Sequence, residues 1–315
     1  MKTKLIIDVD TGIDDAIALA LACRSNQLDI LGVTTVSGNV SLDMATENTV
    51  NVLSLLGVEI PVIPGANQPM ARPPVHEHHV HGDNGLGGAR LPASEKPLVD
   101  ATVQADEWIA QSVQAHEGDI TILLTGPMTN LAMALDRDPK LPEKVSSLVF
   151  MGGSAFDYGN ITPVAEFNIF ADPEAAKKVL NAGFPSVTMV GLDVTRKALL
   201  TPGHLNSLPE SPLTAFLKDA TAHYMMRYEE RNGIKACAMH DPLAVGAVLW
   251  PELLGTVPYY VDVETNSDLC DGQTVVDVQQ RLRKQPNVNV ATTVQSDAFM
   301  KAMLHQFDGK EGSES

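Results

Sequence analysis

The chain has 315 residues, of which 44% are hydrophobic and 19% are charged, a composition typical of a globular protein long enough for one large α/β domain or two smaller ones. Its formal net charge of −17 argues against a nucleic-acid partner and against an anionic membrane surface, because both would require basic side chains to neutralise phosphates. Three widely spaced cysteines, the lack of a signal-peptide pattern and the lack of an apolar helix of bilayer length indicate a reduced, cytoplasmic protein.

The first predicted strand begins at Leu5 and ends in a loop rich in carboxylates. Asp10, Asp14 and Asp15 lie in this loop, directly before an apolar helix over residues 16–22. Open parallel sheets bind ligands at the carboxyl ends of their strands, and neighbouring carboxylates repel one another unless a cation or protons intervene. The loop therefore predicts a metal site. The alternative is that one or two of these carboxylates only cap the helix.

Strand and helix patterns alternate through most of the remaining chain. Further strands are predicted over residues 30–36, 60–63, 120–125, 147–151 and 187–193. Helices are predicted over residues 41–55, 103–115, 131–135, 173–181, 212–231 and 243–250. We expect an α/β fold with a mostly parallel central sheet flanked by helices, and some antiparallel strands near the C-terminus. No repeat or linker interrupts the chain, so we expect a single domain over residues 1–308 and a polar tail over residues 309–315.

One long segment, residues 64–97, lacks the alternating pattern. It contains His76, His78, His79 and His81 among prolines and glycines. A loop of this length in a compact domain is either functional or disordered. Its four histidines could bind a transition metal, but a solvated loop is the favoured interpretation.

Polar residues recur where predicted strands end. Asp10, Asn39 and Thr125 each follow such a strand, and a glycine-rich segment follows Met151. Because the carboxyl ends of parallel strands meet at one edge of a sheet, we expect these residues to line a single crevice.

A second polar group contains Asn160, Glu166 and Asn168. If residues 166–168 are extended, Glu166 and Asn168 share one face and Phe167 lies on the other. A carboxylate and two amides suit a polyhydroxylated ligand such as a sugar. The alternative is a loop that is held by its own side-chain hydrogen bonds.

His240 and Asp241 stand at the start of a predicted helix, directly before Pro242. Asp241 could be only the N-cap of that helix, with proline at the first helical position. The adjacent histidine indicates an acid–base role, because its unperturbed pKa lies near neutrality.

Six segments together resemble the inosine-uridine preferring nucleoside hydrolases, in the same order and at suitable separations. They are residues 8–16, 38–39, 125–127, 151–153, 165–168 and 240–242. The resemblance runs nearly end to end and implies the Rossmann-like nucleoside hydrolase fold. It is strongest with bacterial ribonucleoside hydrolases that retain a histidine before the last aspartate.

The resemblance implies calcium-dependent hydrolysis of the N-glycosidic bond of ribonucleosides, giving free base and ribose, in purine and pyrimidine salvage. The implied Ca²⁺ ligands are Asp10, Asp15, the Thr125 carbonyl and Asp241. The implied substrate contacts are Asp14, Asn39, His81, Met151, Asn160, Glu166, Phe167, Asn168, Tyr224, Tyr228 and His240. A homotetramer or dimer is implied as well.

The chemistry of these residues agrees with that reaction. Cleaving an N-glycosidic bond builds positive charge on the ribose, which surrounding carboxylates and amides stabilise. A bound metal lowers the pKa of water, and Asp10 is the expected general base. A departing base needs a proton donor, for which His240 is the candidate, or stacking by an aromatic ring.

Two alternatives remain open. Residues 6–12 superficially resemble the opening of haloacid-dehalogenase phosphatases, in which Asp8 would be the nucleophile. A relative that binds calcium and nucleoside without turnover would carry the same residues.

Overall fold

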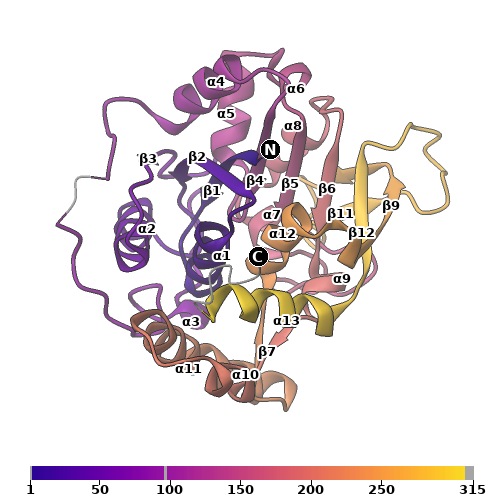
Figure 1. The fold of residues 1–315 in the computed structure, drawn as a ribbon. Coiled ribbons are helices and arrows are strands. Elements are labelled where there is room, and N and C mark those ends of the chain that lie inside the picture. The colour runs from indigo at the N-terminus through magenta and orange to yellow at the C-terminus, as the bar shows by residue number, and fades with distance from the viewer. Residues whose placement is uncertain (1, 96–97, 309–315) are drawn as a thin grey trace.

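The computed structural model describes residues 2–95 and 98–308 (Figure 1). The expected polar tail, residues 309–315, lies outside these described residues. Within them the chain forms one α/β domain around a large central sheet.

The central sheet has eight strands. In chain order they are β1 (Thr3–Val9), β2 (Leu28–Thr35), β3 (Val62–Pro64), β4 (Ile120–Leu124), β5 (Ser147–Met151), β6 (Val187–Val190), β9 (Leu254–Tyr259) and β12 (Val288–Val294). Their order across the sheet is β3-β2-β1-β4-β5-β6-β12-β9. All neighbours are parallel except β12 and β9, which are antiparallel. Two small antiparallel pairs join β7 (Leu199–Leu200) to β8 (Cys237–Ala238) and β10 (Val261–Val263) to β11 (Thr274–Val276). The predicted sheet is confirmed.

Helices follow most strands. They are α1 (Ile13–Arg24), α2 (Leu42–Leu56), α3 (His78–His81), α4 (Ala105–Ala115), α5 (Thr129–Arg137), α6 (Leu141–Lys144), α7 (Phe167–Ala171), α8 (Pro173–Leu180), α9 (Leu192–Thr195), α10 (Pro202–Ser207), α11 (Pro212–Asn232), α12 (His240–Leu249), the 3-10 turn η1 (Pro251–Leu253) and α13 (Ser296–Phe307). Gly57 ends α2 in the left-handed conformation with φ of 71°, as glycine at a helix end commonly does. No described helix is both long and apolar enough to cross a membrane.

The sheet separates two hydrophobic cores. Along β1, Leu5 and Ile7 face a core shared with α1, α11, α12 and α13. Ile6, between them, faces a second core formed with α4, α5 and α8. This alternation follows from the two-residue period of a strand. Figure 1 shows α4, α5 and α6 on one side of the sheet and α11 and α13 on the other.

The strand order places a binding crevice between β1 and β4. The chain runs outward from β1 to β2 and β3, and outward in the opposite direction from β4 to β5 and β6. The order therefore reverses between two adjacent parallel strands, where the following loops diverge and leave room for a ligand. Asp10 follows β1 and Thr125 follows β4, so both lie at this point.

Residues 166–168 are not extended throughout, so the condition under which Glu166 and Asn168 would share one face of a strand is not met. Glu166 is extended, with φ of −88° and ψ of 148°, but Phe167 begins the helix α7. The Glu166 carboxylate accepts from the backbone N–H groups of Asn168 and Ile169, as an N-cap side chain does. A helix of only five residues has too few positions to show a helical period in the sequence.

Candidate active site

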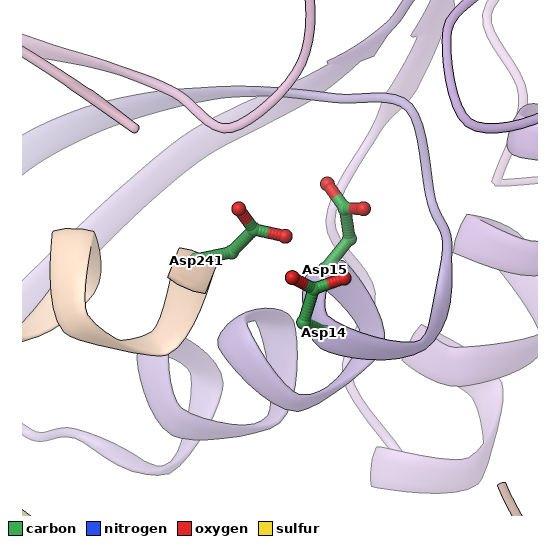
Figure 2. A group of neighbouring side chains, drawn as sticks. All are labelled: Asp14, Asp15 and Asp241. Atoms are coloured by element: carbon green, nitrogen blue, oxygen red, sulfur yellow. The ribbon is translucent and has the colours of Figure 1, made fainter. Parts of the chain in front are cut away.

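Three buried carboxylates meet where α1 and α12 begin. Asp14 and Asp15 belong to the first turn of α1, and Asp241 to the first turn of α12. One oxygen of each lies within 4.8 Å of the others. Figure 2 shows the Asp241 side chain pointing across the gap toward Asp14 and Asp15. Residues more than 200 positions apart are thus brought together by the packing of two helix N-termini.

Asp10 lies behind this cluster and is fully buried. The backbone N–H of Asn39 donates to Asp10 Oδ2 at 2.6 Å, and the Asn39 side chain donates to Oδ1 at 3.1 Å. The same side-chain nitrogen reaches Asp15 Oδ2 at 3.2 Å. Gly38 makes this arrangement possible, since a Cβ there would lie 2.1 Å from Asp10 Oδ2.

Burial raises the pKa of every carboxyl in this group. Burial, followed by repulsion from Asp15, raises the pKa of Asp14 to about 8. Burial and the charge of Asp14 hold the pKa of Asp241 well above its ordinary value. Burial and the charge of Asp15 do the same to the pKa of Asp10. Since none of the described ion pairs brings a lysine or arginine to these groups, protons or a cation must offset their repulsion.

The donor set fits a hard cation. Asp14 Oδ1 is buried and has no hydrogen-bond partner in the described part of the chain, an arrangement that is costly unless a ligand satisfies the atom. Carboxylate and carbonyl oxygens are the ligands that calcium prefers. Among residues 2–95 and 98–308, this is the one group of histidine, cysteine or acidic side chains placed to share an ion. The structure thus gives no support to a metal site in the histidine-rich loop.

Helix capping accounts for part of this cluster. Asp15 Oδ2 accepts the backbone N–H of Gly12 at 2.9 Å, which closes the first turn of α1. Its other oxygen accepts the Thr125 hydroxyl at 2.7 Å. Asp241 makes no such cap bond, because α12 already begins at His240 and its N-cap is Met239. The capping alternative therefore holds for Asp15 alone.

The second polar group forms a hydrogen-bonded wall beside the carboxylates. Glu166 accepts the backbone N–H groups of Gly153 at 2.9 Å and Asn168 at 3.0 Å. Burial raises the pKa of Glu166 to about 7, against the effect of these bonds. The Asn168 side chain donates to the carbonyls of Thr125 at 2.6 Å and Met151 at 3.2 Å. The side chains of Glu166 and Asn168 thus stabilise the loops around them and also line the cavity.

Two histidine rings lie at the site, and Nδ1 of each ring already has a hydrogen-bond partner in the protein. His81 Nδ1 accepts the backbone N–H of Ile13 at 3.0 Å, and His240 Nδ1 lies 2.7 Å from the hydroxyl oxygen of Thr195. Burial lowers the pKa of each histidine to about 3, with a smaller contribution from His240 at His81 and from Arg196 at His240. Both rings are therefore neutral at pH 7.

A cavity of about 840 Å³ opens above these groups. Tyr224 and Tyr228, on α11, line it with their rings edge to face at 6.2 Å between centroids. All predicted site residues line the cavity except two, Asp10 and Asp15, which lie behind its wall. The predicted residues in its lining are Asp14, Asn39, His81, Thr125, Met151, Asn160, Glu166, Phe167, Asn168, Tyr224, Tyr228, His240 and Asp241.

The sequence analysis missed a group that follows β6. Asp193 lines the cavity and accepts the backbone N–H groups of Ala155 and Phe156, each at 2.8 Å. Arg196 also lines it and donates to the carbonyls of Tyr158 and Gly159. Asp193 ends a predicted strand, so the rule that identified Asp10 and Thr125 would have found it.

Asp8 is placed unfavourably for a nucleophile. It is fully buried, accepts hydrogen bonds from Thr34 and from Asn130 at 2.7 Å, and does not line the cavity. Burial raises its pKa to about 7. Because its carboxylate is bonded to Thr34 and Asn130, neither of which lines the cavity, the geometry disfavours the phosphatase alternative.

Comparisons with known proteins agree with this geometry. The family model described as inosine-uridine preferring nucleoside hydrolase matches residues 5–301. The pyrimidine-specific ribonucleoside hydrolase RihB of Escherichia coli O157:H7 is 38% identical over 301 residues, which is 95% of both chains. A plant nucleoside hydrolase, PpNRh1, has 31% identity and a TM-score of 0.91, covering 98% of this chain and 100% of its own. A purine-preferring ribonucleoside hydrolase from Gardnerella vaginalis has 32% identity and a TM-score of 0.90, covering 97% and 98%.

Proposed function

This chain belongs to the inosine-uridine preferring nucleoside hydrolase family, and we propose that it works with a calcium ion held by the carboxylates beneath the cavity. It is a ribonucleoside hydrolase, which cleaves the N-glycosidic bond and releases base and ribose. The metal, the roles of single residues and the range of bases are the parts that we propose.

The buried carboxylate cluster is the observation that carries the calcium proposal. Among the described residues, Asp14, Asp15 and Asp241 lie together without a lysine or arginine partner. Asp14 Oδ1 has no hydrogen-bond partner there, and the neutral ring of His81 lies 3.9 Å from it. We assign the ion to Asp10, Asp15, Asp241 and the Thr125 carbonyl, with Asp14 as a neighbouring ribose contact. The Thr125 carbonyl accepts a hydrogen bond from Asn168, and its second lone pair remains for the cation.

When bound, the ion offsets the repulsion of the carboxylates and lowers the pKa of water in its shell. Asp10 is the proposed general base that takes the proton from the attacking water. Asn39 fixes the orientation of its carboxylate through two hydrogen bonds.

The residues around the cavity wall hold the ribose. Asp14, Asn39 and Asn160 are proposed to bind its hydroxyls, together with Glu166 and Asn168. Because Asn160, Glu166 and Asn168 are already oriented by hydrogen bonds to the protein, they need little rearrangement as positive charge develops on the sugar. Met151 and Phe167 complete the wall around the sugar.

The base is proposed to lie toward α11, between Tyr224, Tyr228 and the two histidines. The neutral ring of His240 assists the departure of the base by donating a hydrogen bond to it, and His81 is the second hydrogen-bond donor on that side. Relatives of similar identity are named pyrimidine-specific and purine-preferring, so we propose that both inosine and uridine are substrates and that the enzyme acts in nucleoside salvage.

Two further properties belong to the proposal. Cys23, Cys237 and Cys270 are free thiols, which suits a reducing compartment such as the cytoplasm. We also propose a homo-oligomer, a dimer or a tetramer, which sedimentation equilibrium would test.

The experiment is hydrolysis of a nucleoside panel that contains inosine, uridine, adenosine and cytidine. Free base is measured by chromatography and ribose as reducing sugar, with calcium and after chelation. We expect release from calcium-loaded protein and loss of release after chelation. Binding of nucleosides without release of any base would instead identify a non-catalytic relative.

A further inference from the structure

The His240 ring contacts the hydroxyl group of Thr195, which is not exposed to the cavity. Thr195, the last residue of α9, is fully buried and does not line the cavity. Its Oγ1 lies 2.7 Å from His240 Nδ1. His240 itself is the first residue of α12 and lines the cavity. Thr195 therefore contacts His240 from the protein interior and not from the cavity.

The direction of this hydrogen bond decides which ring nitrogen carries the proton. A hydroxyl can donate to His240 Nδ1 or accept from it, and among the described residues the Thr195 hydroxyl has no other hydrogen-bond partner that would take its proton. A neutral imidazole that accepts at Nδ1 carries its own proton on Nε2. Because Nδ1 is occupied by Thr195, Nε2 is the nitrogen left for a ligand in the cavity.

His81 provides an internal comparison. Its Nδ1 accepts from the backbone N–H of Ile13 at 3.0 Å, and a backbone N–H can only donate. His81 therefore also carries its proton on Nε2, and it also lines the cavity. With the Thr195 hydroxyl as donor, His240 would have the same tautomer as His81, held by a side chain that can be substituted instead of by the backbone.

We propose that Thr195 is a positioning residue: its hydroxyl fixes the ring and the tautomer of His240, so that Nε2–H is presented to the departing base. This inference rests on the proposed role of His240. Without the hydroxyl, the ring can rotate or carry its proton on Nδ1, and Nε2 would then offer a lone pair where the base needs a donor.

The test compares two variants at this position. Thr195→Val keeps the branched shape and removes the hydroxyl, whereas Thr195→Ser keeps the hydroxyl. By analogy with other residues that orient a functional histidine, we expect Thr195→Val to lower kcat for inosine by about 10- to 100-fold with little change in KM. Thr195→Ser restores most of that activity.

Two controls separate positioning from structural damage. The first is 4-nitrophenyl riboside, whose leaving group needs no proton, so its turnover by Thr195→Val stays near that of the unchanged protein. The second is Thr221→Val, another fully buried threonine, whose hydroxyl donates to the Leu217 carbonyl at 2.6 Å. It does not contact His240, and we expect inosine turnover to be retained.

The His240→Ala variant separates the proposed role of His240 in base departure from the proposed role of Thr195 in positioning His240. If His240→Ala impairs inosine but not the nitrophenyl riboside, His240 assists base departure, and the double variant with Thr195→Val is no worse than His240→Ala alone. If Thr195→Val then retains full inosine turnover, or impairs both substrates equally, the role of Thr195 is refuted while that of His240 stands. Equal losses from His240→Ala refute the role of His240 and the inference with it.

A measurement on the unchanged protein covers the case in which Thr195→Val does not fold. Long-range ¹H–¹⁵N spectra distinguish protonated from unprotonated ring nitrogens, and His240→Ala identifies the signals of His240. We expect His240 to carry its proton on Nε2. Signals of the Nδ1-protonated form would overturn the inference.

Discussion

Asn39 binds both carboxylate oxygens of Asp10, with its backbone N–H 2.6 Å from Oδ2 and its side-chain nitrogen 3.1 Å from Oδ1. The side chain also reaches Asp15 Oδ2 at 3.2 Å, so one residue joins the proposed base to the proposed metal cluster. Asn39 lines the cavity and Asp10 lies behind it. The carboxylate of the proposed base is therefore held in one orientation.

The first prediction separates Asp10 from Asp8. Loss of the general base in Asp10→Asn should lower kcat by about 10²- to 10⁴-fold. Asp8→Asn should keep most of the activity, because the Asp8 carboxylate is bonded to Thr34 and Asn130 and not, as Asp10 is, to Asn39 of the cavity wall. Inosine hydrolysis measures both, and thermal unfolding shows that each variant is folded. Loss of activity only in Asp8→Asn would contradict the hydrolase mechanism and favour Asp8 as a nucleophile.

The second prediction concerns the leaving group. His240→Ala should lower inosine turnover by about 10²- to 10³-fold, the range for loss of one preorganised hydrogen-bond donor, and leave 4-nitrophenyl riboside turnover nearly unchanged. Steady-state kinetics with the two substrates test this difference. Equal losses on both would remove His240 from base departure.

The third prediction concerns pH and stability without calcium. The pKa values of Asp8, Asp14 and Glu166 are about 7, 8 and 7 in the fold, against ordinary values of 3.8, 3.8 and 4.5. Between these limits the three carboxyl groups bind more protons in the folded chain than in the unfolded chain, so they lower stability as pH rises from about 4 to about 8. His81 and His240, whose pKa values fall from 6.5 to about 3, act in the opposite direction up to about pH 6.5. Melting temperatures in a chelator should therefore decrease most steeply between about pH 6.5 and 8.

Calcium should oppose this decrease. A cation binds ionised carboxylates, so the increase in melting temperature on adding calcium should be larger at pH 8 than at pH 5. Asp14→Asn removes one of the three groups and should flatten the chelator curve. A melting temperature in chelator that rises between about pH 6.5 and 8 would contradict the raised pKa values.

The fourth prediction concerns the space for Asp10. In Gly38→Ala the added Cβ would lie 2.1 Å from Asp10 Oδ2, so we expect a loss of about 1–3 kcal/mol of unfolding free energy and a marked loss of activity. Gly203→Ala is the matched control, because its nearest neighbour, Thr201 Oγ1, is 3.6 Å away. Urea unfolding compares the two, and equal stability would show that the loop moves aside at little cost.

Much of this site could be predicted because strand ends are visible in sequence. Asp10, Asn39 and Thr125 each follow an apolar strand, and parallel pairing brings such ends together. The partnership of Asp14 with Asp241 needed more than local pattern, since it depends on α1 packing against α12. The family resemblance supplied that link.

The remaining features of the site depend on tertiary contacts that no local sequence pattern indicates. Glu166 caps a helix too short to show a period, and His240 meets Thr195 only because α9 packs beside α12. Asp10 was expected beside the ligand, but it does not line the cavity, whereas Asn39, which donates to it, does. Such details follow from tertiary packing.

The most direct test of the account is a calcium titration of chelator-treated protein, with inosine hydrolysis and bound calcium measured on the same samples. We expect activity to be absent without calcium and to rise in proportion to the bound ion, reaching its maximum at one ion per chain. Asp241→Asn should weaken calcium binding and require more calcium for the same activity. Full inosine hydrolysis by protein shown to be free of calcium and other divalent metals would contradict the central claim.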